Sequence, residues 1–327
     1  MLIPPMARMP PRPRGAVVRL LSGESMGTSW SARIAAADVD LAAVRAAIQA
    51  ALDQVDGEMS PWKPGSALSA FNQAPAGSAL ALPAQTDAVV GLALRIAGET
   101  DGAFDPTLGR LTDLWGFGPE PFAGGPPDPT ALAEAHALAG WRRLSLDDEG
   151  RLVQPGGVHL DLCGIAKGHG VDLAAGAIEA QGVGSYLVEV GGEVRGAGIK
   201  PDTQPWWVAL EHPASEGAAG LLIAACGTAI ATSGGDRRHF EHAGRRYSHT
   251  LDAATGEPVR ETVLAATVLH PCCAAADALA TALIVMGAER ACAFAETHSL
   301  AAVLTLAGVA GPRRVLSPAA EAMALED

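Results

Sequence analysis

Residues 143–180 read RLSLDDEGRLVQPGGVHLDLCGIAKGHGVDLAAGAIEA, and this stretch decides the fold class. Its first part, 143–154, has two short runs around the turn residues 148–150, a pattern typical of a β-hairpin. Residues 158–162 predict a further strand, which runs into a helix from 165 to about 180. A hairpin beside a strand that leads into a helix indicates mixed α and β structure with antiparallel pairing, rather than a plain Rossmann fold.

The same alternation continues on both sides of that stretch. Residues 17–21 and 28–35 predict two strands, and apolar positions recur at helical spacing from Leu41 to Val55, after Asp38 as the expected cap. Further strands are predicted at 185–190, 206–211, 221–225, 246–251, 264–270 and 301–306, and further helices at 86–97, just before Trp115, at 275–286 and at 288–297. We therefore expect an α+β fold with largely antiparallel sheets flanked by helices.

Composition narrows the classes of function. Lys and Arg total 23 against 36 Asp and Glu, and the net charge of −13 argues against a nucleic-acid partner. The five cysteines include no CxxC, so they predict neither a disulfide framework nor a zinc site. Residues 1–14 are rich in Pro and Arg and are expected to be disordered, with no signal peptide or lipid-attachment Cys, so we expect a cytoplasmic protein. The uncharged residues 217–235 are interpreted as buried strand and loop, so no transmembrane segment is expected.

Two patterns suggest a site for a metal and an anion. Asp277 and Thr281 lie four apart in an apolar run, so both side chains share one helix face, and such hard oxygen donors suit Mg²⁺. Alternatively, Asp277 caps the helix and Thr281 bonds to its own turn. Lys167 follows Asp161 and opens a predicted helix, where an ammonium and free N–H groups would bind a phosphate. Alternatively, Asp161 caps that helix and Lys167 is solvated. Neither GxGxxG nor GxxxxGK[ST] occurs, so a nucleotide would be held in another way.

Weaker candidates lie in loops. Gly-rich segments at 26–28, 190–193 and 232–236 would let backbone approach a ligand, although turns use the same residues. The ring of Trp62 could stack on a planar heterocycle or pack over a helix end.

Phe104 and Asp105 combine a ring with a carboxylate that could accept from an exocyclic amine, or they form a turn before Pro106. His249 could serve as a base, or it is an ordinary surface or core histidine.

Taken in order, these segments resemble the FAD:protein FMN transferase family, the ApbE-type flavin transferases. The resemblance is carried by SMGT (25–28), MSPW (59–62) with FN (71–72), GAFDPT (102–107), LWGFG (114–118), DLCGIAKGHGVD (161–172), VGG (190–192), SG (233–234), SHTLD (248–252) with TG (255–256), and ADA (276–278) with Thr281. It spans roughly residues 25–286, most of the chain.

The resemblance implies a single catalytic domain over residues 15–327, made of two interleaved halves with the active site in the cleft between them. It implies Mg²⁺-dependent cleavage of FAD, with Mn²⁺ as the other metal to consider. FMN would be attached through a phosphoester to a Thr or Ser of an acceptor flavoprotein, and AMP would leave. The family's metal ligands fall on Asp277, Thr281 and the carbonyl of Gly164, and its FAD contacts fall on Met26, Trp62, Ala103, Phe104, Asp105, Lys167 and Thr250. Asp277 and Lys167 would stabilise transition-state charge, with His249 as the base.

Other functions remain open at this stage. The same site with water as acceptor would make a Mg²⁺-dependent FAD pyrophosphatase that releases FMN and AMP. A non-catalytic FAD carrier is disfavoured by Asp277, Thr281 and Lys167 together, because storage needs no metal beside the pyrophosphate. A flavin oxidoreductase is disfavoured because nothing marks a second cofactor site. The acceptor protein and the oligomeric state cannot be inferred from the sequence.

Overall fold

The computed structural model of the chain describes residues 1–5, 10–210, 220–235, 238–260, 262–309 and 311–325. Its main sheet has eight strands in the order β1-β2-β6-β7-β10-β15-β16-β17, and every neighbouring pair is antiparallel. These strands are β1 (Val17–Ser25), β2 (Thr28–Ala36), β6 (Tyr186–Val190), β7 (Glu193–Ala197), β10 (Thr228–Gly234), β15 (Val263–His270), β16 (Ala301–Leu306) and β17 (Arg313–Leu316). The predicted α+β class with antiparallel sheets is confirmed.

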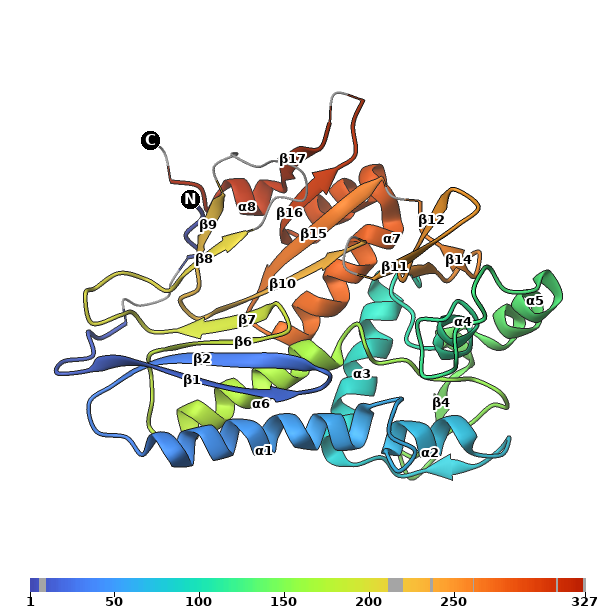
Figure 1. Ribbon diagram of the computed structural model, residues 1–327, viewed down its shortest axis with the longest axis horizontal. Coiled ribbons are helices and arrows are strands. Elements are labelled where there is room, and N and C mark those ends of the chain that lie inside the picture. The colour runs from blue at the N-terminus through green and yellow to red at the C-terminus, as the bar shows by residue number, and fades with distance from the viewer. Residues whose placement is uncertain (6–9, 211–219, 236–237, 261, 310, 326–327) are drawn as a thin grey trace.

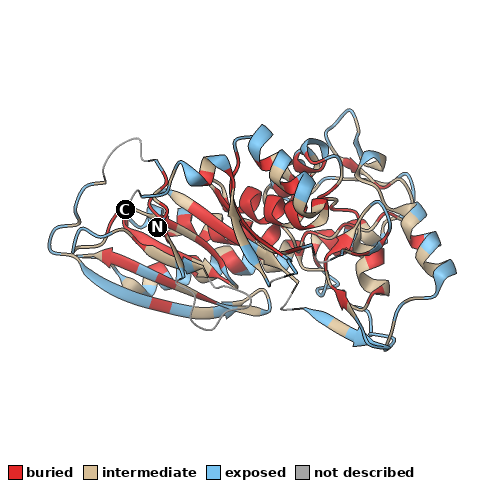
Figure 2. Ribbon diagram, turned by 90° about the horizontal axis from the view of Figure 1, so that it is seen from above, coloured by how far each residue is buried: buried red, intermediate tan, exposed pale blue. Residues whose placement is uncertain are grey.

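Helices cover one face of this sheet (Figure 1). α6 (Ala166–Ala180) packs on β6 and β7, and α7 (Cys273–Thr297) packs on β10 and β15. α1 (Leu41–Met59) lies against α6, and α3 (Ala84–Glu99) against α7. Apolar side chains from these helices and from the sheet form the two largest buried clusters, which Figure 2 shows along the middle of the molecule. α6 and α7 also contact each other, so their N-terminal turns meet above β7.

The opposite face is covered at one end by the hairpin of β8 (Trp207–Leu210) and β9 (Leu221–Ala224), and by α8 (Pro318–Glu321). Leu2 is fully buried there, and its N–H donates to the carbonyl of Leu222 at 2.8 Å. The disorder expected for residues 1–14 is therefore wrong at Leu2. The side chain of Leu2 belongs to a buried apolar cluster on this face of the sheet, which the sequence alone does not reveal. Residues 6–9 lie outside the described residues.

A second part of the molecule lies beyond the ends of α3 and α7 (Figure 1). Its elements are α2 (Ala67–Gln73), α4 (Gly109–Leu114), α5 (Pro129–Leu138), the 3-10 helix η1 (Trp141–Arg143), the sheet β3 (Ala79–Leu80), β5 (Leu152–Val153) and β4 (Ser145–Leu146), and the pairs β11 (His239–His242) with β12 (Arg245–Ser248) and β13 (Leu251–Asp252) with β14 (Glu257–Pro258). Trp115, Phe240 and Tyr247 stack in its core. A cleft lies between this part and the main sheet with its helices α6 and α7.

Two local predictions need correction. The cap of α1 is Asp40, which accepts from the N–H groups of Ala42 and Ala43, and not Asp38. Residues 158–162 form no strand; one isolated bridge joins His159 to Leu108, and the segment is held as buried coil.

The two helices predicted at 275–286 and 288–297 are confirmed: α7 is interrupted between them at Gly287, whose φ of 74° and ψ of 171° are not helical. Among the described helices, α7 alone is long and apolar enough to cross a membrane, with a mean hydropathy of 1.5. Half of that stretch is buried within the protein, which is the packing of a core helix.

Candidate active site

A cleft of about 910 Å³ lies between the two parts of the molecule. From α6, α7 and the sheet, its lining includes Gly164, Lys167, Glu193, Ser233, Asp277 and Thr281, and from the second part Ala103, Phe104, Asp105, Phe117, Arg238, His249 and Thr250. Most residues singled out from the sequence therefore meet in one place. All three predicted Gly-rich segments also contribute to it, through Thr28, Gly191-Gly192 and Gly234.

The oxygen donors predicted to hold a metal lie on one face of α7 and on the loop before α6. Asp277 is 3% exposed, and its Oδ2 accepts a hydrogen bond from the N–H of Gly168 at 3.0 Å. The Thr281 hydroxyl lies 3.3 Å from the carbonyl oxygen of Asp277 and 3.0 Å from Ser233 Oγ. Gly164 adjoins that hydroxyl, because a Cβ there would lie 3.4 Å from Thr281 Oγ1. Thr281 does bond to its own turn, as the alternative interpretation held, yet it also faces the cleft.

This donor set fits a hard cation. Burial raises the pKa of Asp277, although the Lys167 charge and the Gly168 N–H oppose the shift. A cation beside Asp277 would offset the cost of burying that carboxylate. Within the described residues, no group of three His, Cys, Asp or Glu side chains could hold a metal, so a site here would rely on hydroxyl and carbonyl oxygens as well. Such ligands suit Mg²⁺ or Mn²⁺ rather than zinc.

Lys167 is paired with Glu193, which sequence reasoning did not single out as a site residue. The two side chains form an ion pair, and the Glu193 side chain is 3% exposed. Burial, and then the Asp277 charge, raise the pKa of Glu193 to about 7 despite the opposing Lys167 charge. Within the described chain, Glu193 Oε2 is buried without a hydrogen-bond partner. One feature of the sequence could have indicated Glu193, namely its position directly after Gly191-Gly192. These glycines have φ values of 61° and 110° and form the tight turn before β7.

The start of α6 favours the anion-site interpretation over its alternative. Burial opposes the charge on Lys167, but the charges of Asp277 and Glu193 outweigh it and raise the pKa of Lys167, so the ammonium is kept. Asp161 does not cap the helix: Oδ1 accepts from the N–H of Cys163 at 2.9 Å and Oδ2 from the Thr112 hydroxyl at 3.0 Å. The N-cap residue of α6, Ile165, makes no side-chain cap, but the N–H groups of Ala166 and Gly168 already donate to the carbonyl of Leu162 and to Asp277 Oδ2, so the anion site rests on the Lys167 ammonium.

Among the described residues, one ring nitrogen of His249 has a hydrogen-bond partner and the other has none. Its Nδ1 lies 3.1 Å from the carbonyl oxygen of Arg238. Because a carbonyl only accepts, Nδ1 carries the proton and Nε2 keeps its lone pair. Burial is the main cause that lowers the pKa of His249, so the imidazole is neutral near pH 7. A neutral imidazole that lines the cleft has the state a general base needs.

Besides Lys167, four of the residues assigned to FAD contact by resemblance line the cleft: Ala103, Phe104, Asp105 and Thr250. Asp105 is engaged within its own turn, as the alternative held: Oδ1 accepts from the Thr107 N–H at 2.9 Å and hydroxyl at 2.5 Å.

Met26 and Trp62 lie outside the cleft lining. The sulfur of Met26 packs against Gly170 of α6, and the backbone of Met26 has a φ of 53°. Trp62 lies in the loop after α1 and is 48% exposed. The structure does not bring these two side chains to the site, and their FAD contacts stay predictions.

Comparison with known proteins gives consistent matches. The model of the ApbE family matches residues 26–304. The FAD:protein FMN transferase of Vibrio cholerae is 39% identical over 86% of this chain and 85% of its own length, and that of Haemophilus influenzae is 35% identical over 88% and 86%. The flavinyl transferase ApbE of Pseudomonas stutzeri, solved in its apo form, superimposes with a TM-score of 0.88 at 35% identity, over 94% of this chain and 97% of that one.

Proposed function

Since the chain belongs to the ApbE family, we propose that it is an FAD:protein FMN transferase, an enzyme that cleaves FAD and attaches FMN to a Thr or Ser of an acceptor flavoprotein. Relatives of this name match over most of their length. The observation that carries the proposal is the grouping of Asp277, Thr281, Lys167 and His249 around one cleft. The grouping supplies oxygen donors, a cation and a base, which phosphoryl transfer from a pyrophosphate requires.

The negative charge of the FAD pyrophosphate is the main barrier to attack by a hydroxyl. The Lys167 ammonium would bind its oxygens and stabilise charge that builds in the transition state. Asp277, Thr281 and the Gly164 carbonyl would hold Mg²⁺, or Mn²⁺ in its place, which supplies a Lewis acid when bound. Glu193 keeps Lys167 at the cleft wall through their ion pair.

The transfer step balances with the groups present. The acceptor hydroxyl oxygen bonds to the phosphorus on the FMN side, and the bond from that phosphorus to the bridging oxygen breaks. AMP leaves with the bridging oxygen, and the hydroxyl proton passes to His249 Nε2. Because positioning and electrostatics dominate phosphoryl transfer, His249 would contribute less than the donor set on α7.

AMP release tests this proposal against its two rivals. The protein is incubated with FAD and Mg²⁺, with and without an acceptor flavoprotein domain that carries the Thr to be modified within its surrounding sequence (the Thr motif). AMP and FMN are then quantified by chromatography. A transferase releases AMP in step with acceptor modification and yields little free FMN. Equal free FMN and AMP without an acceptor would identify a pyrophosphatase, and intact FAD throughout would identify a carrier. The cytoplasmic location expected from the sequence stays a prediction that cell fractionation checks.

A further inference from the structure

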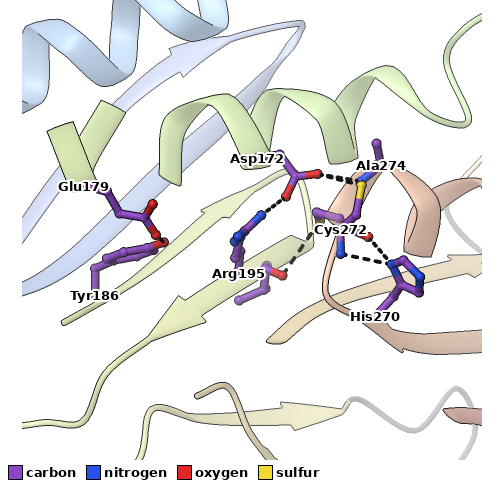
Figure 3. A network of polar contacts seen from close by, with 9 residues as sticks. Asp172, Glu179, Tyr186, Arg195, His270, Cys272 and Ala274 are labelled. Atoms are coloured by element: carbon purple, nitrogen blue, oxygen red, sulfur yellow. Dashed lines mark hydrogen bonds and ion pairs between the residues drawn. The ribbon is translucent and has the colours of Figure 1, made fainter. Parts of the chain in front are cut away.

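Lys167, Glu193 and Asp277, three of the charged residues that line the cleft, come from three elements, and behind the cleft the same three elements are connected again. Lys167 lies on α6, Glu193 on β7 and Asp277 on α7. Asp172 lies further along α6, and Arg195 lies two residues after Glu193 on β7. Figure 3 shows Asp172 between Arg195 and the first turn of α7. Neither Asp172 nor Arg195 lines the cleft.

The N-terminus of α7 lacks a cap of its own. Its N-cap residue, Cys272, makes no side-chain cap hydrogen bond. Instead, Asp172 Oδ2 accepts from the N–H of Ala274 at 3.0 Å and from the Cys272 thiol at 3.3 Å (Figure 3). Ala274 is the second residue of the helix, whose N–H a cap normally satisfies. Asp172 therefore caps α7 from a neighbouring helix.

The other oxygen of Asp172 is used as well. Asp172 Oδ1 forms an ion pair with the Arg195 guanidinium, and the two side chains are 16% and 30% exposed. The Asp172 carboxylate thus contacts two positively charged groups, the partially positive N-terminus of α7 and the Arg195 guanidinium on β7. This joins α6, α7 and β7 at one point.

The cap lies one turn from the predicted metal ligands. Gly168 on α6 donates to Asp277 Oδ2, while Asp172, one turn later on α6, accepts from Ala274, one turn earlier on α7. Two hydrogen bonds therefore connect the helices: Gly168 to Asp277 in the site, which we call the front rung, and Ala274 to Asp172 behind it, the rear rung. The helices can approach this closely because residue 168 is glycine: a Cβ there would lie 2.4 Å from the carbonyl oxygen of Cys273.

We propose that Asp172 and Arg195 are positioning residues that set the place of α7 on α6, and thereby the geometry of Asp277 and Thr281 for a divalent cation. This inference rests on the metal site of the proposed function. Loss of the rear rung leaves the front rung to hold α7 alone. The oxygen donors would then lose alignment, and cation affinity would fall although no ligand has changed.

Direct Mn²⁺ binding to the purified protein without FAD tests the inference, with free Mn²⁺ measured by electron paramagnetic resonance. We expect Asp172→Ala to weaken Mn²⁺ binding about tenfold, the lower end of the loss typical when a residue that orients metal ligands is removed. Asp172→Asn keeps an acceptor for Ala274 and should restore most of the affinity. Arg195→Met should weaken binding less than Asp172→Ala, since the cap itself remains.

Asp40→Ala is the matched control, because it removes the side-chain cap of α1 away from the cleft. It should lower the melting temperature as Asp172→Ala does, with Mn²⁺ affinity unchanged. Wild-type affinity in both Asp172→Ala and Asp172→Asn would overturn the inference and leave Asp172 with a purely structural role. A wild-type protein that binds no Mn²⁺ would overturn the proposed metal site itself, so the two failures are distinguishable.

Discussion

Two hydrogen bonds connect α6 and α7, Gly168 to Asp277 in the cleft (the front rung) and Ala274 to Asp172 behind it (the rear rung). The carboxylates at these two places differ in how fully they are paired. At the rear rung, both oxygens of Asp172 have partners: Arg195 on one, and Ala274 and Cys272 on the other. At the front, in the cleft, Asp277 is buried with its pKa raised, and beside it Glu193 Oε2 is buried without a partner among the described residues. Behind the cleft, both oxygens of Asp172 therefore have hydrogen-bond or ion-pair partners. In the cleft, a carboxylate oxygen of Glu193 has none among the described residues and could accept from a ligand.

This difference separates residues that hold the fold from residues that hold a ligand. A buried carboxylate without full hydrogen bonding destabilises a protein unless a cation or donor arrives. A satisfied one behind it supplies the rigidity that keeps such a site in shape. Substitutions at the front should therefore change activity more than stability, and substitutions that leave one partner of an ion pair buried should change both.

The largest expected effect is at Asp277. Asp277→Asn keeps an acceptor for the Gly168 N–H but removes the charge, so we expect FMN transfer to fall about 10⁴-fold. Thermal unfolding should be unchanged or shifted upward, because a desolvated charge is lost. Asp113→Asn is the control: burial raises the pKa of Asp113 to about 6, but the residue lies outside the cleft lining. Equal loss of activity in both variants would contradict the contrast drawn here.

His249→Gln should lower the transfer rate about 10³-fold, as expected for loss of a general base. The lowered pKa of His249 also has a consequence for the wild type: the acid limb of the pH profile should have its midpoint below 6.5, the ordinary value for a histidine. The pH profile of the transfer rate measures both. His136→Gln serves as a comparison, since His136 bonds to the carbonyl of Ala253 and does not line the cleft. An acid limb that survives in His249→Gln would assign it to another group.

Lys167→Met should lower transfer about 10²-fold through loss of an oxyanion partner. It should also lower the free energy of unfolding at pH values above about 7, where Glu193 is ionised in the wild type and would be left buried without a counter-charge. The double variant Lys167→Met/Glu193→Gln separates the two effects, with stability recovered and activity still low. Stability that stays low in the double variant would show that Glu193 is not the cause.

The pH dependence of stability offers a smaller effect. Glu193 has a raised pKa of about 7 in the folded protein, against an ordinary 4.5, so the folded state binds more protons than the unfolded state between these values. The free energy of unfolding of the metal-free protein should therefore decrease as pH rises from 4.5 to 7. Glu193→Gln should remove this component in denaturant titrations at several pH values. An unchanged slope in that variant would place the titration elsewhere.

Trp62 should have the smallest effect. Its exposed ring lies outside the cleft lining, so we expect Trp62→Ala to change the KM for FAD by less than about threefold, a fraction of the value of an aromatic contact. Steady-state kinetics with varied FAD measures this. A rise of tenfold or more would show that the loop after α1 moves onto bound FAD, as the family resemblance implies.

The sequence predicted the parts of the site that depend on local spacing. Asp277 and Thr281 share a helix face by their interval of four, and Lys167 opens a helix after a loop, so both could be identified without tertiary contacts. Glu193 and Asp172 could not, because their roles depend on residues far away in the chain. The strand predicted at 158–162 was wrong for the same reason: its apolar alternation reflects burial of Leu160 and Leu162 in coil and not sheet pairing.

The most direct test of the account is the intact mass of an acceptor domain with the Thr motif, after incubation with the protein, FAD and Mg²⁺. The account predicts a mass gain of one FMN moiety with the wild type, and loss of that gain with chelator or with Asp277→Asn. A gain that persists in Asp277→Asn, or in the presence of chelator, would contradict the claim that the donors at the front rung of α6 and α7 carry the reaction.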